Sequence, residues 1–212
     1  MFDSGLEGPV TAKVVSPVFG GTGPLVMPAF AEGTMILTDR GERAAETLSR
    51  GDRVLTRDNG YRPVLWTGRR AGAAAGLSGF GPVEVGAGAL GEGRPARETV
   101  VSPDQRLLLA GPLAEALGVG QESLARAADL VGIRGIRRAE GSAPLYVQIA
   151  LAGHEILCAN GAWTESLPVS PVVLASLPGA VREELASLLP GVRVAPARAN
   201  ADRVQLRRAG AA

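Results

Sequence analysis

Residues 28–60 read "PAFAEGTMILTDRGERAAETLSRGDRVLTRDNG", and this stretch has the clearest structural pattern in the chain. "TMILT" (34–38) is a short apolar run followed by the turn "DRG", and "RVLTR" (53–57) alternates as a half-buried strand does. "DNG" (58–60) marks a hairpin, because Asn and Gly tolerate the positive φ that primed turns need. The stretch therefore predicts short antiparallel strands joined by tight turns.

Strand signals continue through the next hundred residues. Pro63 lies within "YRPVLWTGRR", the expected partner strand of that hairpin, and predicts an edge position because proline cannot donate a ladder hydrogen bond. "LYVQIALAGHEILCANG" predicts a second hairpin that turns at residues 152–153. Its side chains on one face are Val147, Ile149 and Leu151. Further strands are expected in "PVEVGAGALG" (82–91) and "ETVVSPDQRLLLA" (98–110).

The composition fits one globular domain made mainly of β-strands. The 212 residues are 46% hydrophobic but only 4% aromatic, and 29 glycines and 15 prolines supply frequent turns. The formal net charge is +1, so no overall field attracts nucleic acid and we expect no nucleic-acid partner. Cys158 is the single cysteine, which excludes an internal disulfide. One cysteine and one histidine cannot build a zinc site, so we expect no metal and no cofactor.

Two regions of the second half predict helices. "GPLAEALGVGQESLARAADLVG" (111–132) contains two short helical patches with glycine between them. "LPGAVREELASLLPG" (177–191) predicts an amphipathic C-terminal helix, because its apolar residues form one stripe and Gly191 follows its end. The stripe consists of Val181, Leu185, Leu188 and Leu189.

The two ends of the chain show no regular pattern. Residues 1–27 read as an extended lead-in, and the tail after Val192 carries five arginines against one aspartate. Such a tail is typical of a solvated arm, with contact to an anionic partner as the alternative. The start, "MFDSGLEGPVTAKVV", is acidic where a signal peptide is basic, and no stretch approaches about 18 uninterrupted apolar residues. We therefore expect no membrane span and a cytoplasmic location, with signal-independent secretion left open.

Three separated stretches resemble the Hedgehog/intein (Hint) domain family, and in particular its bacterial branch. "FAEGTMILTDRGERAAETLSRGDRVLTRDNG" is similar to the family's opening, in which Cys-Phe-x-x-Gly-Thr precedes a strand and Gly-Asp-x-Val follows. "VSPDQRLLL" is similar to the family's Thr/Ser-x-x-His block. "LYVQIALAGHEILCANG" resembles the late block with His-x-Phe/Ile-x-Ala-Asn-Gly, and the three occur in the family's order over residues 28–166.

The resemblance implies an all-β, Hint-type horseshoe of two pseudo-symmetric halves, with short helices and a C-terminal amphipathic helix. It divides the chain into a lead-in (1–27), a Hint domain (28–170) and a C-terminal helix with an arginine-rich tail (171–212) packed on or beside it. The family's activity is autoproteolysis or protein splicing. A Cys or Ser at the first domain position attacks the preceding carbonyl, and a histidine protonates the departing amide nitrogen.

Two of the family's reactive positions carry other residues in this chain. Ala29 stands at the nucleophile position, and its methyl group has no lone pair, so the Pro28–Ala29 bond cannot undergo the N–S acyl shift. The second block has Ser102, which can still donate a hydrogen bond, and Gln105 in place of the proton donor. The Gln105 amide does not titrate near neutrality, and its alternative role is that of a strand residue hydrogen-bonded to a turn. The resemblance therefore implies a degenerate active site.

The late block keeps His154, at the position that assists C-terminal cleavage in the family. An exposed or capping histidine at the hairpin turn is the alternative. Glu165 and Ser166 follow where splicing would need an asparagine to cyclise. Cys158 lies in an apolar strand and is expected to pack in the core rather than to replace the nucleophile.

Several interpretations of function remain open. The favoured one is a natural, catalytically silent Hint domain, and an active autoprocessor with an engineered Cys-to-Ala trap at position 29 is another. A non-enzymatic binding or scaffold module could use the loop 71–81, the helix 177–190 or the arginine-rich tail as its partner surface. A hydrolase is disfavoured, because no Gly-x-Ser-x-Gly elbow accompanies His154. "GGTGP" and "GFGPVEVG" lack the Lys-Ser/Thr of a phosphate-binding loop.

Overall fold

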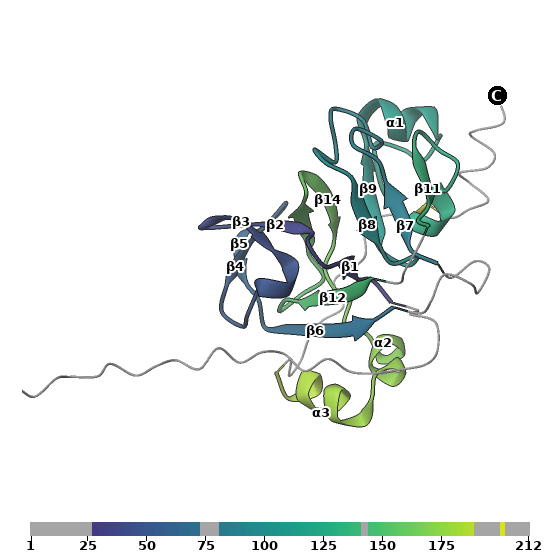
Figure 1. Ribbon diagram of the computed structural model, residues 1–212. Coiled ribbons are helices and arrows are strands. Elements are labelled where there is room, and N and C mark those ends of the chain that lie inside the picture. The colour runs from purple at the N-terminus through teal and green to yellow at the C-terminus, as the bar shows by residue number, and fades with distance from the viewer. Residues whose placement is uncertain (1–26, 73–80, 141–143, 189–199, 202–212) are drawn as a thin grey trace, which may run out of the picture.

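The computed structural model describes residues 27–72, 81–140, 144–188 and 200–201, which form two β-sheets and a few short helices (Figure 1). Frequent glycine turns keep the strands short, as the sequence pattern predicts. The first sheet has six strands, in the spatial order β11 (Ile136–Arg138), β7 (Val83–Val85), β8 (Thr99–Val101), β1 (Phe30–Ala31), β12 (Leu145–Ala150) and β6 (Trp66–Ala71).

The second sheet has nine strands within the described parts of the chain. Their order is β15 (Asn200–Ala201), β10 (Glu122–Arg126), β9 (Arg106–Ala110), β14 (Ala162–Glu165), β13 (Ile156–Ala159), β2 (Met35–Thr38), β4 (Arg53–Thr56) and β5 (Gly60–Pro63), with β3 (Gly41–Ala44) paired to β2. The strand β5 ends the order, so Pro63 lies on an edge strand as predicted.

The helices are short and few among the described residues. They are α1 (Gly111–Ala116), α2 (Pro171–Ser176) and α3 (Gly179–Leu188), with the 3₁₀ turns η1 (Ala45–Thr47) and η2 (Ala127–Leu130). The prediction of a mainly-β fold with short helices and a C-terminal amphipathic helix is confirmed. The helix α2 is one that the sequence analysis missed. Its start carries a standard signal, because the Ser170 hydroxyl accepts the Val173 N–H (3.2 Å) and Pro171 is the first helical residue.

Three local predictions are wrong, two in their strand pairing and one in the type of element. Residues 145–161 do not form a hairpin, because β12 pairs with β1 and β6 in the first sheet whereas β13 pairs with β14 in the second. Residues 61–70 likewise divide between β5 and β6, which belong to different sheets. The second helical patch of 111–132 is replaced by β10, whose five residues pair in register with β9. In each case, pairing with another strand outweighs the local pattern.

Some sequence predictions fall on parts of the chain outside the described residues. These parts are the lead-in 1–26, residues 73–80 of the predicted loop, the end of the C-terminal helix from Leu189, and the arginine-rich tail except residues 200–201.

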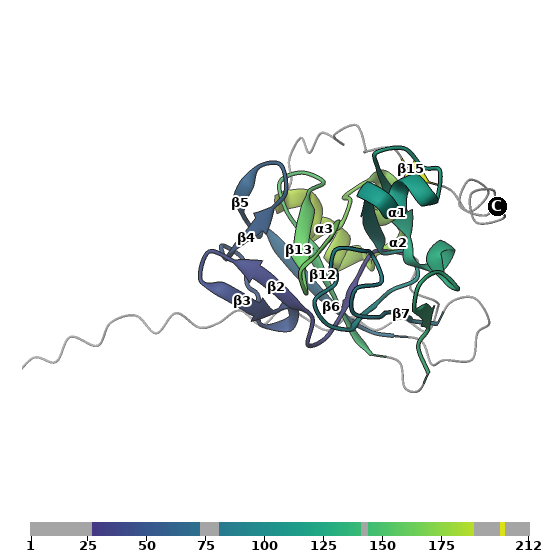
Figure 2. The same ribbon diagram turned by 90° about the horizontal axis from the view of Figure 1, so that it is seen from above.

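Two large apolar clusters stabilise the fold. The larger one contains Val147, Ile149 and Leu151, which share one face of the β12 segment as predicted. The second cluster joins the first sheet to the C-terminal helices, and α3 lies beside β6 and β12 (Figures 1 and 2). It comprises Met27, Ala29, Trp66, Tyr146, Ala150, Leu167, Leu177, Val181 and Leu185. The residues around position 29 therefore share a core with the C-terminal helix.

Candidate functional site

Ser102, which directly follows β8, makes hydrogen bonds to the backbone on both sides of the Pro28–Ala29 bond. The Ser102 hydroxyl accepts a hydrogen bond from the Ala29 N–H (3.0 Å) and donates one to the Met27 carbonyl (2.9 Å). The Ser102 N–H donates to the Ala29 carbonyl (2.9 Å). Ala29 is only 1% exposed and Ser102 is fully buried. The hydroxyl thus contacts the nitrogen that an acyl shift at this bond would release.

Gln105 closes the tight turn that Ser102 begins, since its N–H donates to the Ser102 carbonyl (3.1 Å). Its side chain is fully buried, and Nε2 donates to Thr164 Oγ1 (2.7 Å) and to the Glu165 carbonyl (2.7 Å). Oε1 has no hydrogen-bond partner among the described residues. Both donors of the carboxamide are therefore used by β14, so the amide is anchored to that strand.

His154 lies next to a buried carboxylate. Its Nε2 is 2.8 Å from Oε2 of Glu165, and the imidazole is 10% exposed. The carboxylate also accepts the Arg106 N–H (3.0 Å) and lies 3.4 Å from the Arg106 guanidinium. The alternative of an exposed histidine at a hairpin turn is therefore wrong, because His154 is largely buried and precedes β13 in a connection between two sheets.

The sequence analysis named Glu165 only as standing where splicing would need an asparagine, and it missed the place of this residue in the network. It is fully buried, and it joins Gln105 through its carbonyl to His154 through its carboxylate. A charged residue at the end of the apolar-alternating run "AWTE" was the available signal. The fold thus connects all four expected site positions through polar contacts. Ala29 is bonded to Ser102 through its backbone, Ser102 to Gln105 through the turn, and Gln105 to His154 through Glu165.

Ser166 and Cys158 contribute differently from the site residues above. The buried Ser166 hydroxyl accepts the Glu155 N–H (3.0 Å), a structural bond across the connection that precedes β13. Cys158 is half-buried on β13, directly opposite Trp163 of β14. Burial raises the pKa of the Cys158 thiol, which lowers its thiolate fraction and makes it a poor nucleophile.

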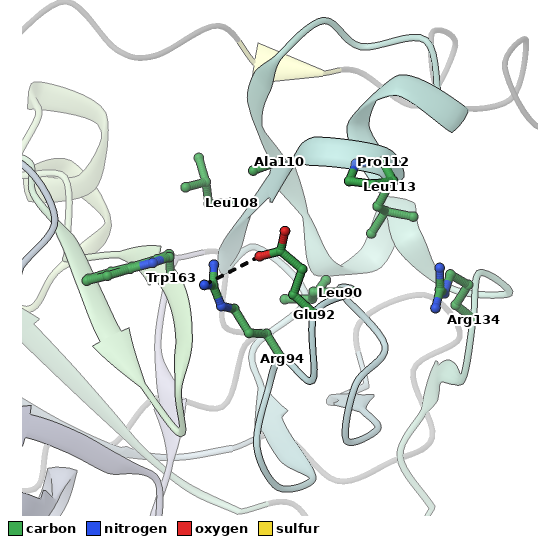
Figure 3. A pocket seen from close by; sticks show the side chains of 10 residues that line it. Leu90, Glu92, Arg94, Leu108, Ala110, Pro112, Leu113, Arg134 and Trp163 are labelled. Atoms are coloured by element: carbon green, nitrogen blue, oxygen red, sulfur yellow. Dashed lines mark ion pairs between the residues drawn. The ribbon is translucent and has the colours of Figure 1, made fainter.

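Two pockets, called hollows below, are not lined by the residue at position 29. Figure 3 shows the first, a cavity of about 150 Å³ in which Arg94 extends toward Trp163 and Glu92, with 3.4 Å between the Arg94 guanidinium and the Glu92 carboxylate. The second, of about 420 Å³, is acidic, and burial raises the pKa of its Glu84 carboxyl although Arg137 contacts it. Ala29, Ser102, Gln105 and His154 line neither hollow.

Within the described parts of the chain, no group of three or more His, Cys, Asp or Glu side chains is arranged to hold a metal ion. The helices of the same parts are too short or too polar to cross a membrane.

The two sheets and the short helices define a mainly-β domain in which the Pro28–Ala29 bond lies beside the buried Ser102. The sequence profile of the Hint domain family matches residues 28–170, so the chain belongs to the Hint domain family. No curated protein sequence matches the chain.

Solved structures with a similar fold include two inteins and one intein-like domain. The gp41-1 intein is 15% identical, with a TM-score of 0.43, and the match covers 65% of this chain and 97% of that one. The MchDnaB-1 intein is 16% identical, with a TM-score of 0.42 and coverage of 65% and 99%. The bacterial intein-like domain from Clostridium thermocellum is 16% identical, with a TM-score of 0.41 and coverage of 65% and 97%.

Proposed function

We propose that this chain is a self-processing domain of the Hint family that is catalytically silent as it stands. One observation carries the proposal: Ser102 makes three hydrogen bonds to the backbone of residues 27–29, one of them to the N–H of the Pro28–Ala29 amide, while the side chain that would attack the Pro28 carbonyl is a methyl group. This arrangement supports a cleavage-site segment that lacks its nucleophile. A methyl group supplies no electron pair for a new bond to carbon.

The proton-donor position supports the same proposal. In an acyl shift, sulfur bonds to the Pro28 carbonyl carbon, the carbon–nitrogen bond breaks, and the released nitrogen of residue 29 gains a proton. Gln105 cannot release a proton near neutrality. Its two N–H donors are directed at Thr164 and Glu165 instead of at the Pro28–Ala29 bond. His154 is paired with Glu165 and makes no hydrogen bond to the Pro28–Ala29 bond among the described residues.

Restoring both positions tests the proposal. We expect the double variant Ala29→Cys/Gln105→His, incubated with a small thiol, to be cut after Pro28, with the product identified by intact mass spectrometry. The single variants Ala29→Cys and Gln105→His are the matched controls, and Gln105→His alone should stay intact because it has no nucleophile. A double variant that folds and stays intact at every thiol concentration and pH would count against a self-processing ancestry for this site.

A non-enzymatic scaffold is the second candidate, and the packing of α3 limits it. Val181 and Leu185, the centre of the apolar stripe, are buried against β6 and β12. This stripe is therefore not available to a partner while α3 is docked. A scaffold role for the helix has to use its polar face, and its test is whether charge reversal at Arg182 and Glu183 abolishes a partner complex isolated with the wild-type chain.

A further inference from the structure

The second sheet ends at a strand that comes from the arginine-rich tail. Among the described residues, β15 (Asn200–Ala201) is the last strand of the order and lies beside β10 (Glu122–Arg126). The two strands run parallel, with Asn200 opposite Leu124 and Ala201 opposite Ala125. On its other side, β10 pairs with β9 along all five of its residues. Residues 200–201 of the tail thus cover part of the outer edge of β10.

The outer edge of β10 has a buried centre and a charged residue at each end. The three central residues, Ser123, Leu124 and Ala125, are no more than 2% exposed. Glu122 begins the strand and Arg126 ends it, so the two ends carry opposite charges. The edge of a sheet offers backbone N–H and C=O groups that pair readily with another extended chain. The edge of β10 therefore fits an extended segment with small side chains in its middle and the complementary charges at its ends.

The sequence around β15 has the pattern of such a segment. Residues 197–202 read "ARANAD", in which alanines alternate strictly with polar residues. Strict alternation over this length is typical of a strand with one face toward a core. Pro196 directly precedes the run, and a proline is tolerated at the start of a strand because no ladder hydrogen bond from its nitrogen is required there. The pattern predicts a strand that is longer than the two residues of β15.

The register of β15 matches the charges of the two strands. Glu122, Leu124 and Arg126 share one face of β10, because side chains alternate along a strand. Continuing the observed register by one residue forward would bring Asp202 opposite Arg126, and two residues backward would bring Arg198 opposite Glu122. Both are pairs of opposite charge on the same face. Shifting the register by two residues in either direction would lose both pairs, and shifting it by one would turn the charged residues to the other face.

The two charged ends of β10 have capacity for these partners. Glu122 forms an ion pair with Arg57, and the Glu122 side chain is still 30% exposed. The Arg126 guanidinium lies 2.5 Å from the Asp104 carboxylate, and the Arg126 side chain is 45% exposed. A carboxylate has two acceptor oxygens and a guanidinium has five N–H donors, so each can bind a second partner. Opposite charges on neighbouring strands stabilise their pairing, whereas like charges directly opposite destabilise it.

We propose that the outer edge of β10 is a binding site for an extended segment, and that residues 198–202 of this chain's own tail fill it as a parallel strand. The register is set by Arg198 beside Glu122 and by Asp202 beside Arg126. The site recognises a basic and an acidic residue at these two positions, with small side chains between them. The tail closes the edge of the second sheet against pairing with another chain. The interpretation of the tail as a solvated arm then applies to its residues outside 198–202.

Limited trypsin digestion of the full-length chain tests the proposal, because trypsin cuts after arginine. A paired strand has to detach before a protease can bind it, so first cuts after Arg198 should be about tenfold slower than first cuts after Arg193 or Arg207. These two arginines lie in the same tail outside residues 197–202 and serve as internal controls. Intact mass spectrometry identifies the first cuts. Equal rates at the three arginines would overturn the proposal.

Charge reversal tests the register in the full-length chain. Arg198→Glu places a second carboxylate opposite Glu122, so the β10 amides that face β15 should exchange with solvent about tenfold faster, as measured residue by residue by NMR. Adding Glu122→Arg should restore their protection. The matched control is Arg193→Glu, which makes the same change of charge outside the strand and should have no effect. If Arg198→Glu and Arg193→Glu act alike, the proposal is refuted.

The other end of the strand supplies a second test, because Glu122→Arg also removes the partner of Arg57. Asp202→Arg should accelerate exchange of the same β10 amides, and Arg126→Glu should restore their protection. A reversal at either end that is not rescued by its partner substitution in a folded chain contradicts the register. Protection that rises with protein concentration would show that the tail of a second copy fills the edge, and would overturn the assignment to the chain's own tail.

Discussion

Ser102→Ala is the substitution that most directly tests the hydrogen bonds of the Ser102 hydroxyl beside the Pro28–Ala29 bond. The hydroxyl satisfies the Ala29 N–H and the Met27 carbonyl, and all three groups lie in buried residues. Removing it leaves one backbone donor and one backbone acceptor without a partner. Each unsatisfied buried group costs about 1–3 kcal/mol, so the two groups together are expected to cost roughly 2–6 kcal/mol of unfolding free energy. That is a large part of the stability of a typical domain.

The loss is measured by urea unfolding, with Ser123→Ala as the matched control. Ser123 is also a buried serine, and its hydroxyl donates to the Val119 carbonyl (2.6 Å), its single hydrogen-bond partner among the described residues. Its removal should cost about 1 kcal/mol. Hydrogen exchange at the Ala29 amide supplies an independent check, because Ser102→Ala should accelerate it while Ser102→Thr preserves protection. If Ser102→Ala lowers the unfolding free energy no more than Ser123→Ala does and leaves the exchange of the Ala29 amide unchanged, the reasoning about the Ser102 hydrogen bonds is refuted.

Two further predictions concern the helix cover and the acidic hollow. Leu185→Ala should lower the unfolding free energy by about 2–5 kcal/mol, because Leu185 is fully buried in the cluster that joins α3 to β6. Fluorescence quenching should show that Trp66 becomes more exposed to solvent. Leu188 is only partly buried, so Leu188→Ala should cost less, and equal costs would contradict the packing. Burial raises the pKa of the Glu84 carboxyl, so the folded chain holds this proton more tightly than the unfolded chain does. The contribution of Glu84 to the unfolding free energy therefore falls as pH rises above the ordinary carboxyl range. Glu84→Gln should flatten that part of the pH profile of the urea midpoint, and an unchanged slope would refute it.

Local patterns explain which parts of the fold were predictable. Alternation in "RVLTR" and the "DNG" turn specify β4 and β5 through neighbours only a few residues apart, and the structure pairs them as a hairpin. The edge position of Pro63 follows from its missing N–H alone. By contrast, β12 and β13 look like a hairpin in sequence but join different sheets. Their pairing with β1 and β14 depends on the packing of distant segments, which a local sequence pattern does not predict.

The candidate site, too, was predictable only in part from the sequence. The resemblance of the second block to the Hint family singled out Ser102 and Gln105, and residue chemistry alone shows that alanine cannot act as a nucleophile. The hydrogen bond from Ala29 to Ser102, however, joins residues 73 positions apart.

The amino-acid sequence by itself determined the class of fold, the family and the chemical incapacity of position 29, since these depend on residue identity and on periodicities within a few residues. Only the tertiary structure decided that Ser102 hydrogen-bonds the Ala29 N–H and that Glu165 joins Gln105 to His154. Such contacts arise when distant strands pair and bury one another's side chains, and long-range pairing is set by packing of the whole chain rather than by any one segment.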